Sequence, residues 1–414
     1  MIADDVTTGL RPAESARVRR MHLPARADQL GMTVREADRA LKLNGGGDGL
    51  LDTTHFDTVR FPPPVWASEV MLEVMSDGAA AYTPYRGAPE VLAPLAANLT
   101  GFLGTTVTPD NLALTPGTQG GLFATLAAIV DEGDLVMLAD PEYLFIERML
   151  EFLGARVVRI PLDHTSATPT LDIAAIEALL PEKPALLVYS NPNNPTGSIF
   201  TAESLARVAE LAVSGGFRVL ADELYSRLVY PGTEYTHMRS LPGMAERCIT
   251  MLGPSKTESL SGFRLGIVVG PEDVMAAVEQ TLAATALRAP AYAQRLLTRW
   301  LVDDHEFLAE RLVDLAALRE LTVAKLRTVP GLKVTPQQGT AYLFCDVRGL
   351  GVDDVTVAAT LQREAGVIVS PGYQFGPSGL GHFRVCYARD EAEWTAALDR
   401  MVTALTALGG GPRG

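Results

Sequence analysis

The sequence is poor in cysteine, in positive charge and in long apolar runs. Its three cysteines, Cys248, Cys345 and Cys386, are widely spaced, so we expect neither a disulfide framework nor a metal site. The formal net charge of −14 argues against nucleic acids and anionic membranes as partners. Hydrophobic residues make up 47% of the chain, yet no run is long enough to cross a bilayer. The start, Met1 to Asp5, lacks the basic and apolar regions of a signal peptide, so we expect a cytoplasmic location.

Lysine is scarce as well, and one of the five lysines has unusual neighbours. Lys256 lies among small and polar residues in the run from Gly253 to Gly266 (GPSKTESLSGFRLG). A lysine amine whose pKa is lowered by burial or by a nearby cation can form a Schiff base with an aldehyde. Ser255 and Arg264 suit a phosphate dianion, through a hydroxyl and a planar guanidinium. For an isolated Ser-Lys pair, the alternative is a surface lysine in a flexible loop.

Two upstream segments belong with this run. Asn191 to Gly197 has the sequence NPNNPTG, and Asp222 to Tyr225 has the sequence DELY. Taken in chain order with the Ser-Lys pair and with Arg-Leu-Gly from Arg264, these elements resemble the class I/II aminotransferases, which are fold-type-I pyridoxal-5′-phosphate enzymes. The resemblance extends from about residue 80 to Arg384. Each element alone is a weak signal, whereas the four in this order are highly specific.

The expected fold class is α/β. From Asn111 the chain alternates between apolar strand-like runs and helical patterns, which is typical of a parallel sheet. The resemblance implies a fold-type-I PLP-transferase: a large domain with a mostly parallel seven-stranded sheet flanked by helices, and a smaller α+β domain built from the N-terminal segment and the C-terminal part. The predicted boundaries are 1–62 (N-terminal arm and part of the small domain), 63–290 (large PLP-binding domain) and 291–414 (small domain).

Several elements can be placed from the apolar patterns. The small domain should contain a long helix from Phe307 to Leu326 and strands over Leu332–Thr335 and Ala341–Val347. Pro12 to Arg39 is weakly helical. Helices of the large domain are expected over Leu122–Val130, Leu171–Leu180, Ala202–Ala212 and Asp273–Ala286.

A glycine-rich turn follows the strand that contains Leu114. Such a strand-to-helix turn presents free backbone amides and the positive end of a helix to an anion. The resemblance implies that Gly117, Thr118 and Gln119 in this turn bind the cofactor phosphate, together with Ser255 and Arg264. It also implies that Tyr82 reaches across a homodimer to the phosphate bound by the partner subunit.

Four residues are implied around the cofactor ring. Asp222 ends an apolar strand, where parallel sheets bind ligands, and a carboxylate beside the pyridine nitrogen keeps that nitrogen protonated. The alternative for Asp222 is a helix N-cap. The resemblance places Tyr225 and Asn194 at the phenolic oxygen and stacks Tyr143 on the ring. Tyr143 after a strand is otherwise a core aromatic.

An arginine lies in the middle of the apolar strand His382 to Ala388. An unpaired arginine there would be costly, so Arg384 should have an anionic partner. The resemblance supplies that partner as the α-carboxylate of the substrate, with Asn194 as a further substrate contact. Arg389, at the end of the strand, is expected to be solvated.

Other positions stay open. His55, Phe56 and Asp57 stand where related chains commonly have a glycine-containing strand, so they either reshape the substrate pocket or belong to a rerouted loop. Arg288 either reaches an active site across a dimer or lies on the surface. Whether Glu258 faces the substrate is not readable from the sequence.

The predicted reaction is transamination between an L-amino acid and a 2-oxo acid, with Lys256, Asp222 and Tyr225 as catalytic residues. Elimination, cyclisation and oxidation at the α-carbon are alternatives, because the same cofactor supports them. A regulator that binds the cofactor without turnover is the non-enzyme alternative. Asp57, Glu142 and Glu258 suggest a cationic side chain on the substrate, such as an arginine-derived amino acid like enduracididine.

Overall fold

The centre of the molecule is an eight-stranded sheet. A computed structural model describes residues 15–21, 50–56, 61–77 and 81–409. The strand order is β2-β9-β8-β7-β6-β3-β4-β5. Neighbouring strands from β8 to β4 run parallel, whereas β9 is antiparallel to both β8 and β2. The strands are β2 (Leu112–Pro116), β3 (Leu135–Asp140), β4 (Arg156–Asp163), β5 (Thr170–Leu171), β6 (Leu186–Ser190), β7 (Arg218–Asp222), β8 (Cys248–Leu252) and β9 (Leu265–Val269).

The prediction of a mostly parallel sheet with seven strands is confirmed for the strands of five residues or more. The two-residue β5 adds an antiparallel edge to β4. The central strands are apolar because both faces of the sheet are covered, as in other parallel sheets. In β3, for example, all six residues are buried.

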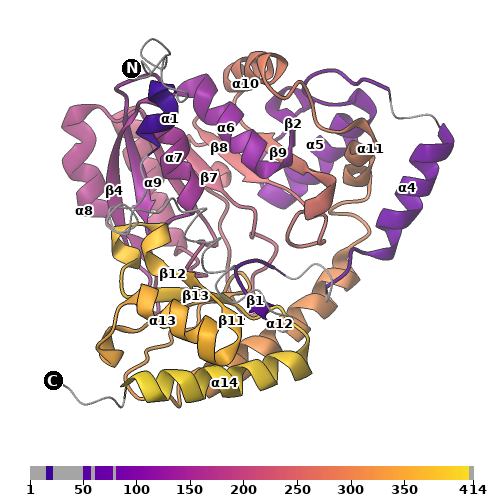
Figure 1. Ribbon diagram of the computed structural model, residues 1–414. Helices are drawn as coiled ribbons and strands as arrows, with labels where there is room; N and C mark the ends of the chain where they lie inside the picture. The colour runs from indigo at the N-terminus through magenta and orange to yellow at the C-terminus, as the bar shows by residue number, and fades with distance from the viewer. Residues whose placement is uncertain (1–14, 22–49, 57–60, 78–80, 410–414) are drawn as a thin grey trace, which may run out of the picture.

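Helices cover both faces of this sheet (Figure 1). Alternate residues of β3 belong to different cores: Val136 and Leu138 pack with α6, α7 and α10, whereas Met137 and Ala139 pack with α8 and α9. This alternation follows from the two-residue period of a strand. The helices are α4 (Val65–Asp77), α5 (Pro89–Leu103), α6 (Gly117–Ile129), α7 (Leu144–Leu153), α8 (Ile173–Leu179), α9 (Ala202–Gly215), α10 (Glu272–Ala284) and α11 (Ala291–Gln294).

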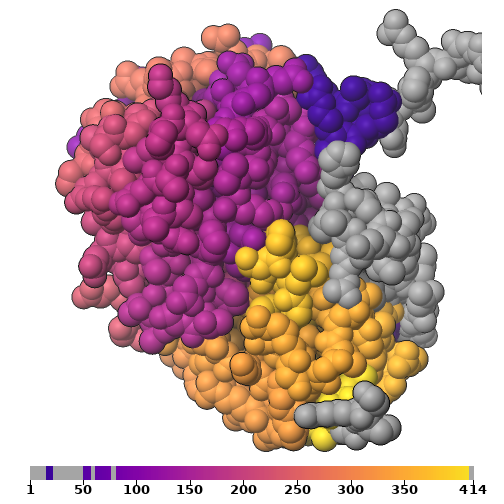
Figure 2. Space-filling model, turned by 90° about the vertical axis from the view of Figure 1, so that its left-hand side faces the viewer, coloured from indigo at the N-terminus to yellow at the C-terminus, as the bar shows by residue number. Residues whose placement is uncertain are grey.

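The C-terminal part forms a second lobe against the first, seen in orange and yellow in Figure 2. It contains a three-stranded sheet of order β10-β13-β12 and a parallel pair of β1 with β11. Because β1 comes from the N-terminal segment, that segment and the C-terminal part both contribute to this lobe, as predicted. Its elements are β1 (Leu51–Asp52), α12 (His305–Leu326), β10 (Tyr342–Asp346), α13 (Asp354–Thr360) with a π-helical turn (Leu361–Ala365), β11 (Val367–Ile368), β12 (Ser370–Pro371), β13 (His382–Cys386) and α14 (Glu391–Gly409).

Some predicted elements differ from the structure. The strand predicted over 332–335 is wrong, because only Lys333 forms an isolated bridge, to Asp346. Leu332 and Val334 are buried in the core of the small lobe without a backbone ladder. Within the predicted helical stretch 12–39, the described part contains the short helix α1 (Ala16–Arg20), and residues 12–14 and 22–39 lie outside the described residues.

Residues shortly after 290 pack with the large lobe. Leu296, Leu297 and Trp300 are buried in one cluster with α4, α5 and β9, all of which belong to the large lobe. Leu315 and Leu318 of α12 belong to the core of the small lobe. We therefore propose a boundary near the start of α12, with residues 291–304 in the large domain.

Some absences hold for the described residues. No helix there is long and apolar enough to span a membrane. No group of histidine, cysteine and acidic side chains in the same ranges is arranged to hold a metal ion. All three cysteines are buried and free.

Candidate active site

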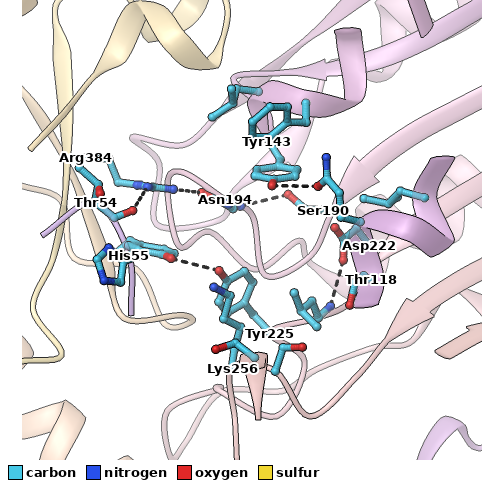
Figure 3. A pocket seen from close by; sticks show the side chains of 18 of the residues that line it. Thr54, His55, Thr118, Tyr143, Ser190, Asn194, Asp222, Tyr225, Lys256 and Arg384 are labelled. Carbon is cyan, nitrogen blue, oxygen red and sulfur yellow. Dashed lines mark hydrogen bonds between the residues drawn. The ribbon is translucent and has the colours of Figure 1, made fainter. Parts of the chain in front are cut away.

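A pocket of about 320 Å³ opens at the carboxyl edge of the central sheet. The segments that follow β2, β3, β6, β7 and β8 all converge there, because parallel strands end at the same edge. Figure 3 shows Arg384 approaching from the side opposite Asp222, with Lys256 below. Ten of the predicted site residues line this pocket: Thr118, Gln119, Tyr143, Asn194, Asp222, Tyr225, Ser255, Lys256, Arg264 and Arg384.

One end of the pocket is shaped for an anion. Gly117 has a φ of +75°, and a Cβ atom there would collide with the guanidinium of Arg264. A Cβ on Gly266 would lie 2.5 Å from the backbone nitrogen of Thr118. The hydroxyl of Thr118 is buried and has no hydrogen-bond partner among the described residues. An arginine, a free hydroxyl and a close-packed glycine turn at the start of α6 together form an anion cradle.

Asp222 lies at the end of β7 and is 7% exposed. Burial raises its pKa to about 6, while the nearby Lys256 acts in the opposite direction. Its Oδ1 accepts a hydrogen bond from the backbone nitrogen of Leu224 at 3.2 Å. The chain forms a turn here and no helix starts at Asp222, so the N-cap alternative is wrong.

Three aromatic or amide side chains surround the middle of the pocket. The Tyr143 hydroxyl donates to Oε1 of Gln119 at 3.0 Å, and burial raises the pKa of the phenol. The phenol of Tyr225 lies 3.1 Å from that of Tyr342, a pocket residue that the sequence analysis did not single out. The backbone nitrogen of Asn194 donates to the Ser190 hydroxyl at 3.0 Å. Tyr143, Tyr225 and Asn194 therefore all line the same small pocket.

Arg384 is buried, and its guanidinium has no carboxylate partner among the described residues. Its guanidinium donates to Oδ1 of Asn194 and to the backbone oxygen of Thr54, both at 2.6 Å. The rings of Tyr342 and Phe375 lie 4.3 and 4.8 Å from its central carbon. All these neighbours are neutral, so the positive charge of the arginine stays uncompensated. This arrangement favours binding of a carboxylate in the pocket.

Glu142 precedes the pocket residue Tyr143 in the sequence, but its side chain does not line the pocket. Its carboxylate accepts hydrogen bonds at 2.7 Å from the backbone nitrogens of Tyr143 and Ser190, and one at 2.5 Å from the Ser190 hydroxyl. Burial raises its pKa to about 8. Glu142 therefore braces two pocket loops and does not line the pocket.

Glu258 also points away from the pocket. It is fully buried and pairs with Arg227, a residue that the sequence analysis did not single out. Arg227 directly precedes the apolar run 228–230, and this charge next to apolar residues was the available signal. Asp57, the third acidic residue of the substrate hypothesis, lies outside the described residues.

The segment around His55 forms one wall of the pocket. Thr54 and His55 both line it, and the His55 side chain is 60% exposed. Arg389 fixes this segment by donating to the backbone oxygens of Asp52 and His55, at 2.5 and 2.6 Å. Arg389 is 1% exposed, so the expectation that it is solvated is wrong. The guanidinium of Arg389 therefore fixes the backbone of this segment through hydrogen bonds.

Tyr82 lies outside the pocket of its own chain. It is 87% exposed, and its ring lies 4.6 Å from the guanidinium carbon of Arg288. Tyr85 lies on the same guanidinium at 5.0 Å. Arg288 also donates to the backbone oxygen of Thr83 at 2.6 Å. Arg288 is thus held beside Tyr82, and neither residue lines the pocket.

Comparison with known proteins decides the family. The family model for aminotransferases of class I and II matches residues 52–401. The chain belongs to the class I and II aminotransferases. It is 30% identical over 379 residues to an aspartate/prephenate aminotransferase of Thermus thermophilus, covering 90% of this chain and 95% of that one. It is 29% identical over 348 residues to an aspartate aminotransferase of Musicola paradisiaca, covering 84% and 87%.

The fold comparison agrees with the family. A crystal structure of an aspartate aminotransferase from Rhodobacter sphaeroides matches with a TM-score of 0.84 and 34% identity, over 91% of this chain and 99% of that chain. The aminotransferase is therefore a fold-type-I enzyme, and its cofactor is pyridoxal 5′-phosphate. The site fits this cofactor: the anion cradle at Thr118 and Arg264 suits a phosphate, and the buried carboxylate of Asp222 suits a protonated pyridine.

Proposed function

We propose that this aminotransferase moves the α-amino group of an L-amino acid to a 2-oxo acid by a ping-pong mechanism. The observation that carries the proposal is the convergence of Lys256, Asp222 and Arg384 on one pocket. A lysine amine, a buried carboxylate and an uncompensated guanidinium match the aldehyde, the pyridine and the substrate carboxylate of this chemistry. The aminotransferase names of the relatives support the same reaction.

Each of these residues has its own task in the proposal. Pyridoxal phosphate, when bound, supplies an electron sink for the carbon–hydrogen bond that breaks. Asp222 holds the proton on the pyridine nitrogen, which strengthens that sink. Lys256 carries the cofactor in the resting enzyme, and its freed amine then moves the proton from the α-carbon of the substrate. Arg384 fixes the α-carboxylate and hence the orientation of the bond.

Several further lining residues would hold the cofactor. Tyr143 would stack on the ring, and Tyr225 and Asn194 would contact the phenolic oxygen. Asn194 also holds Arg384, so it links cofactor and substrate. We assign the phosphate to Gly117, Thr118, Gln119, Ser255 and Arg264.

A basic or arginine-derived substrate has little support from the pocket. Glu142 and Glu258 are committed to interior contacts, and Asp222 is the one carboxylate that lines the pocket within the described ranges. Leu144, Phe145 and Tyr342 contribute apolar surface instead. We therefore propose an uncharged or aromatic side chain as the preferred substrate class. Because the relatives are named aspartate/prephenate aminotransferase and aspartate aminotransferase, the first test also includes acidic substrates.

We propose a homodimer with shared active sites. Tyr82 is exposed and does not line its own pocket, as expected of a residue that serves a partner subunit. Helix α4 also presents an apolar stripe, with Val65, Leu72 and Met75 each more than 70% exposed. Burial of such a stripe would favour association. Sedimentation that gives a monomer at working concentration would contradict the dimer.

A cytoplasmic location is part of the proposal. The three buried, free cysteines suit a reducing compartment. Cell fractionation tests this directly, and recovery of the enzyme with membranes or in the medium would contradict it.

The proposed reaction can be tested from absorption spectra of the purified holoenzyme. A band near ~420 nm should move towards ~330 nm when an L-amino acid is added without a 2-oxo acid. A panel of aromatic, aliphatic, acidic and basic amino acids then ranks the substrates. Preference for arginine or lysine would overturn the proposed substrate class.

The same experiment separates transamination from other reactions at the α-carbon. Elimination releases ammonia together with a 2-oxo acid and needs no 2-oxo acid as co-substrate, whereas oxidation consumes dioxygen. Release of ammonia or consumption of dioxygen at the rate of the spectral change would overturn transamination and leave the cofactor assignment intact.

A further inference from the structure

Tyr342 lies between the two ends of the pocket. Its hydroxyl is 3.1 Å from that of Tyr225, and its ring is 4.3 Å from the guanidinium carbon of Arg384. All three side chains are buried, with exposed fractions of 3%, 5% and 6% in that order. Tyr342 and Arg384 come from the paired strands β10 and β13, whereas Tyr225 follows β7 of the large lobe. One phenol thus touches both the cofactor side and the substrate side.

Either phenol could donate in this pair, and the surroundings of Tyr225 select the direction. Burial raises the pKa of Tyr225 well above its ordinary value, so its phenol keeps its one hydrogen. The phenolic oxygen of a bound cofactor carries negative charge and is a stronger acceptor than a neutral phenol. Tyr225 then donates to the cofactor, and its own oxygen is left to accept from Tyr342. A hydrogen bond received in this way strengthens the one that is given.

The arginine acts on the other end of Tyr342. A cation above a phenol ring draws electron density from it and makes the hydroxyl a better donor. When a substrate carboxylate pairs with Arg384, most of that positive charge is compensated. The donation from Tyr342 to Tyr225 should then weaken.

We propose that Tyr342 is a positioning residue that couples the substrate-binding arginine, Arg384, to the cofactor-facing phenol, Tyr225. The inference rests on the roles given to those two residues in the proposed function. Through this path, arrival of the substrate carboxylate raises the proton affinity of the lysine-bound cofactor, because the phenolic oxygen loses part of its stabilisation.

The first test is a pH titration of the absorbance of lysine-bound cofactor in the wild type and in Tyr342→Phe. The substitution removes one hydroxyl and keeps the ring over Arg384. We expect the pH midpoint of the absorbance change to rise by about 0.1 to 0.5, because a neighbouring hydrogen bond strengthens the one that Tyr225 gives by a fraction of its value. An unchanged midpoint would overturn the inference.

A matched control exists in the small lobe. Tyr230 and Tyr387 form a second buried phenol pair, 2.6 Å apart, and neither lines the pocket. Tyr230→Phe removes an equivalent hydroxyl, so it should lower the melting temperature and leave the midpoint of the cofactor titration at the wild-type value. If Tyr342→Phe behaves in the same way, Tyr342 has a structural role only and the inference is wrong.

The second test adds an unreactive carboxylate, 3-phenylpropanoate, at saturation. The midpoint should rise in the wild type and rise by less in Tyr342→Phe, because one path between carboxylate and cofactor is missing. Equal rises would overturn the coupling. A wild-type holoenzyme without a titrating band would instead show that the assignment of Lys256 is wrong, and the inference would fail with it.

Discussion

Arg227 and Asp304 form a two-point ion pair in the interior, with each guanidinium nitrogen 2.8 Å from a carboxylate oxygen. The same guanidinium also pairs with Glu258, two residues after Lys256. Arg311 of α12 donates from the same side to the backbone oxygen of Thr257 at 2.5 Å. The lysine loop is therefore clamped from behind by charges that belong to the turn after β7 and to the start of α12.

This clamp predicts a large loss of stability when Arg227 is removed. Arg227→Met leaves the carboxylates of Glu258 and Asp304 buried without their partner, and we expect a loss of about 3–5 kcal/mol in the free energy of unfolding. Glu258→Gln should cost less, because the pair between Arg227 and Asp304 remains. Urea unfolding of the holoenzyme at fixed protein concentration measures both.

The control for this prediction is an exposed arginine with two acidic partners. Arg207 pairs with Glu177 and Glu210 on the surface. Arg207→Met should change the unfolding midpoint little, because exposed ion pairs are weak. Equal losses for Arg207→Met and Arg227→Met would contradict a clamp that acts through burial.

Glu142 predicts a dependence of stability on pH. Its pKa in the folded protein is about 8, above the ordinary 4.5, because it is buried. A carboxyl group with a raised folded pKa stabilises fully below pH 4.5, and this contribution is lost as the pH rises through about 8. Glu142→Gln should therefore flatten the decline of the free energy of unfolding between these limits. The same slope in wild type and variant would show that Glu142 is ionised throughout.

Where the signal is local, the sequence predicted which residues come together. Lys256 with Ser255, and Asp222 with Tyr225, are short motifs whose backbone fixes their positions at the ends of strands. Ten predicted residues line one pocket for this reason. The sheet was predictable on similar grounds, because fully apolar runs separated by helices have few other solutions.

The direction of charged side chains was not predictable in the same way. Glu258 pairs with Arg227, 31 positions away, and Tyr342 meets Tyr225 at a separation of 117. Arg389 is buried because it bonds to backbone oxygens of 52 and 55, more than 330 positions earlier. These contacts depend on how the lobes pack, and no period or motif in the chain encodes them.

Asp222 predicts how cofactor binding depends on pH. Burial raises its pKa to about 6 in the cofactor-free protein, so the carboxylate that a protonated pyridine requires is lost below that pH. The dissociation constant of pyridoxal phosphate should rise as the pH falls from 7 to 5 in the wild type, and rise less in Asp222→Asn. The cofactor phosphate also titrates, with a pKa of about 6, and this titration contributes equally to both proteins. Parallel curves for wild type and Asp222→Asn would contradict the role of this carboxylate.

Arg384 predicts a loss of affinity confined to substrates that carry a carboxylate. Lysine at this position keeps the charge and loses the planar fork, so Arg384→Lys should raise the KM of both the amino acid and the 2-oxo acid by about 10- to 100-fold. The decarboxylated analogue of the amino acid, an amine that serves as a poor substrate, should react equally well with wild type and variant. This comparison isolates the carboxylate contact, because any general damage to the pocket would slow both substrates. Equal losses for the amino acid and its decarboxylated analogue would mean that Arg384 maintains the pocket through Asn194 and Thr54 and does not hold the substrate.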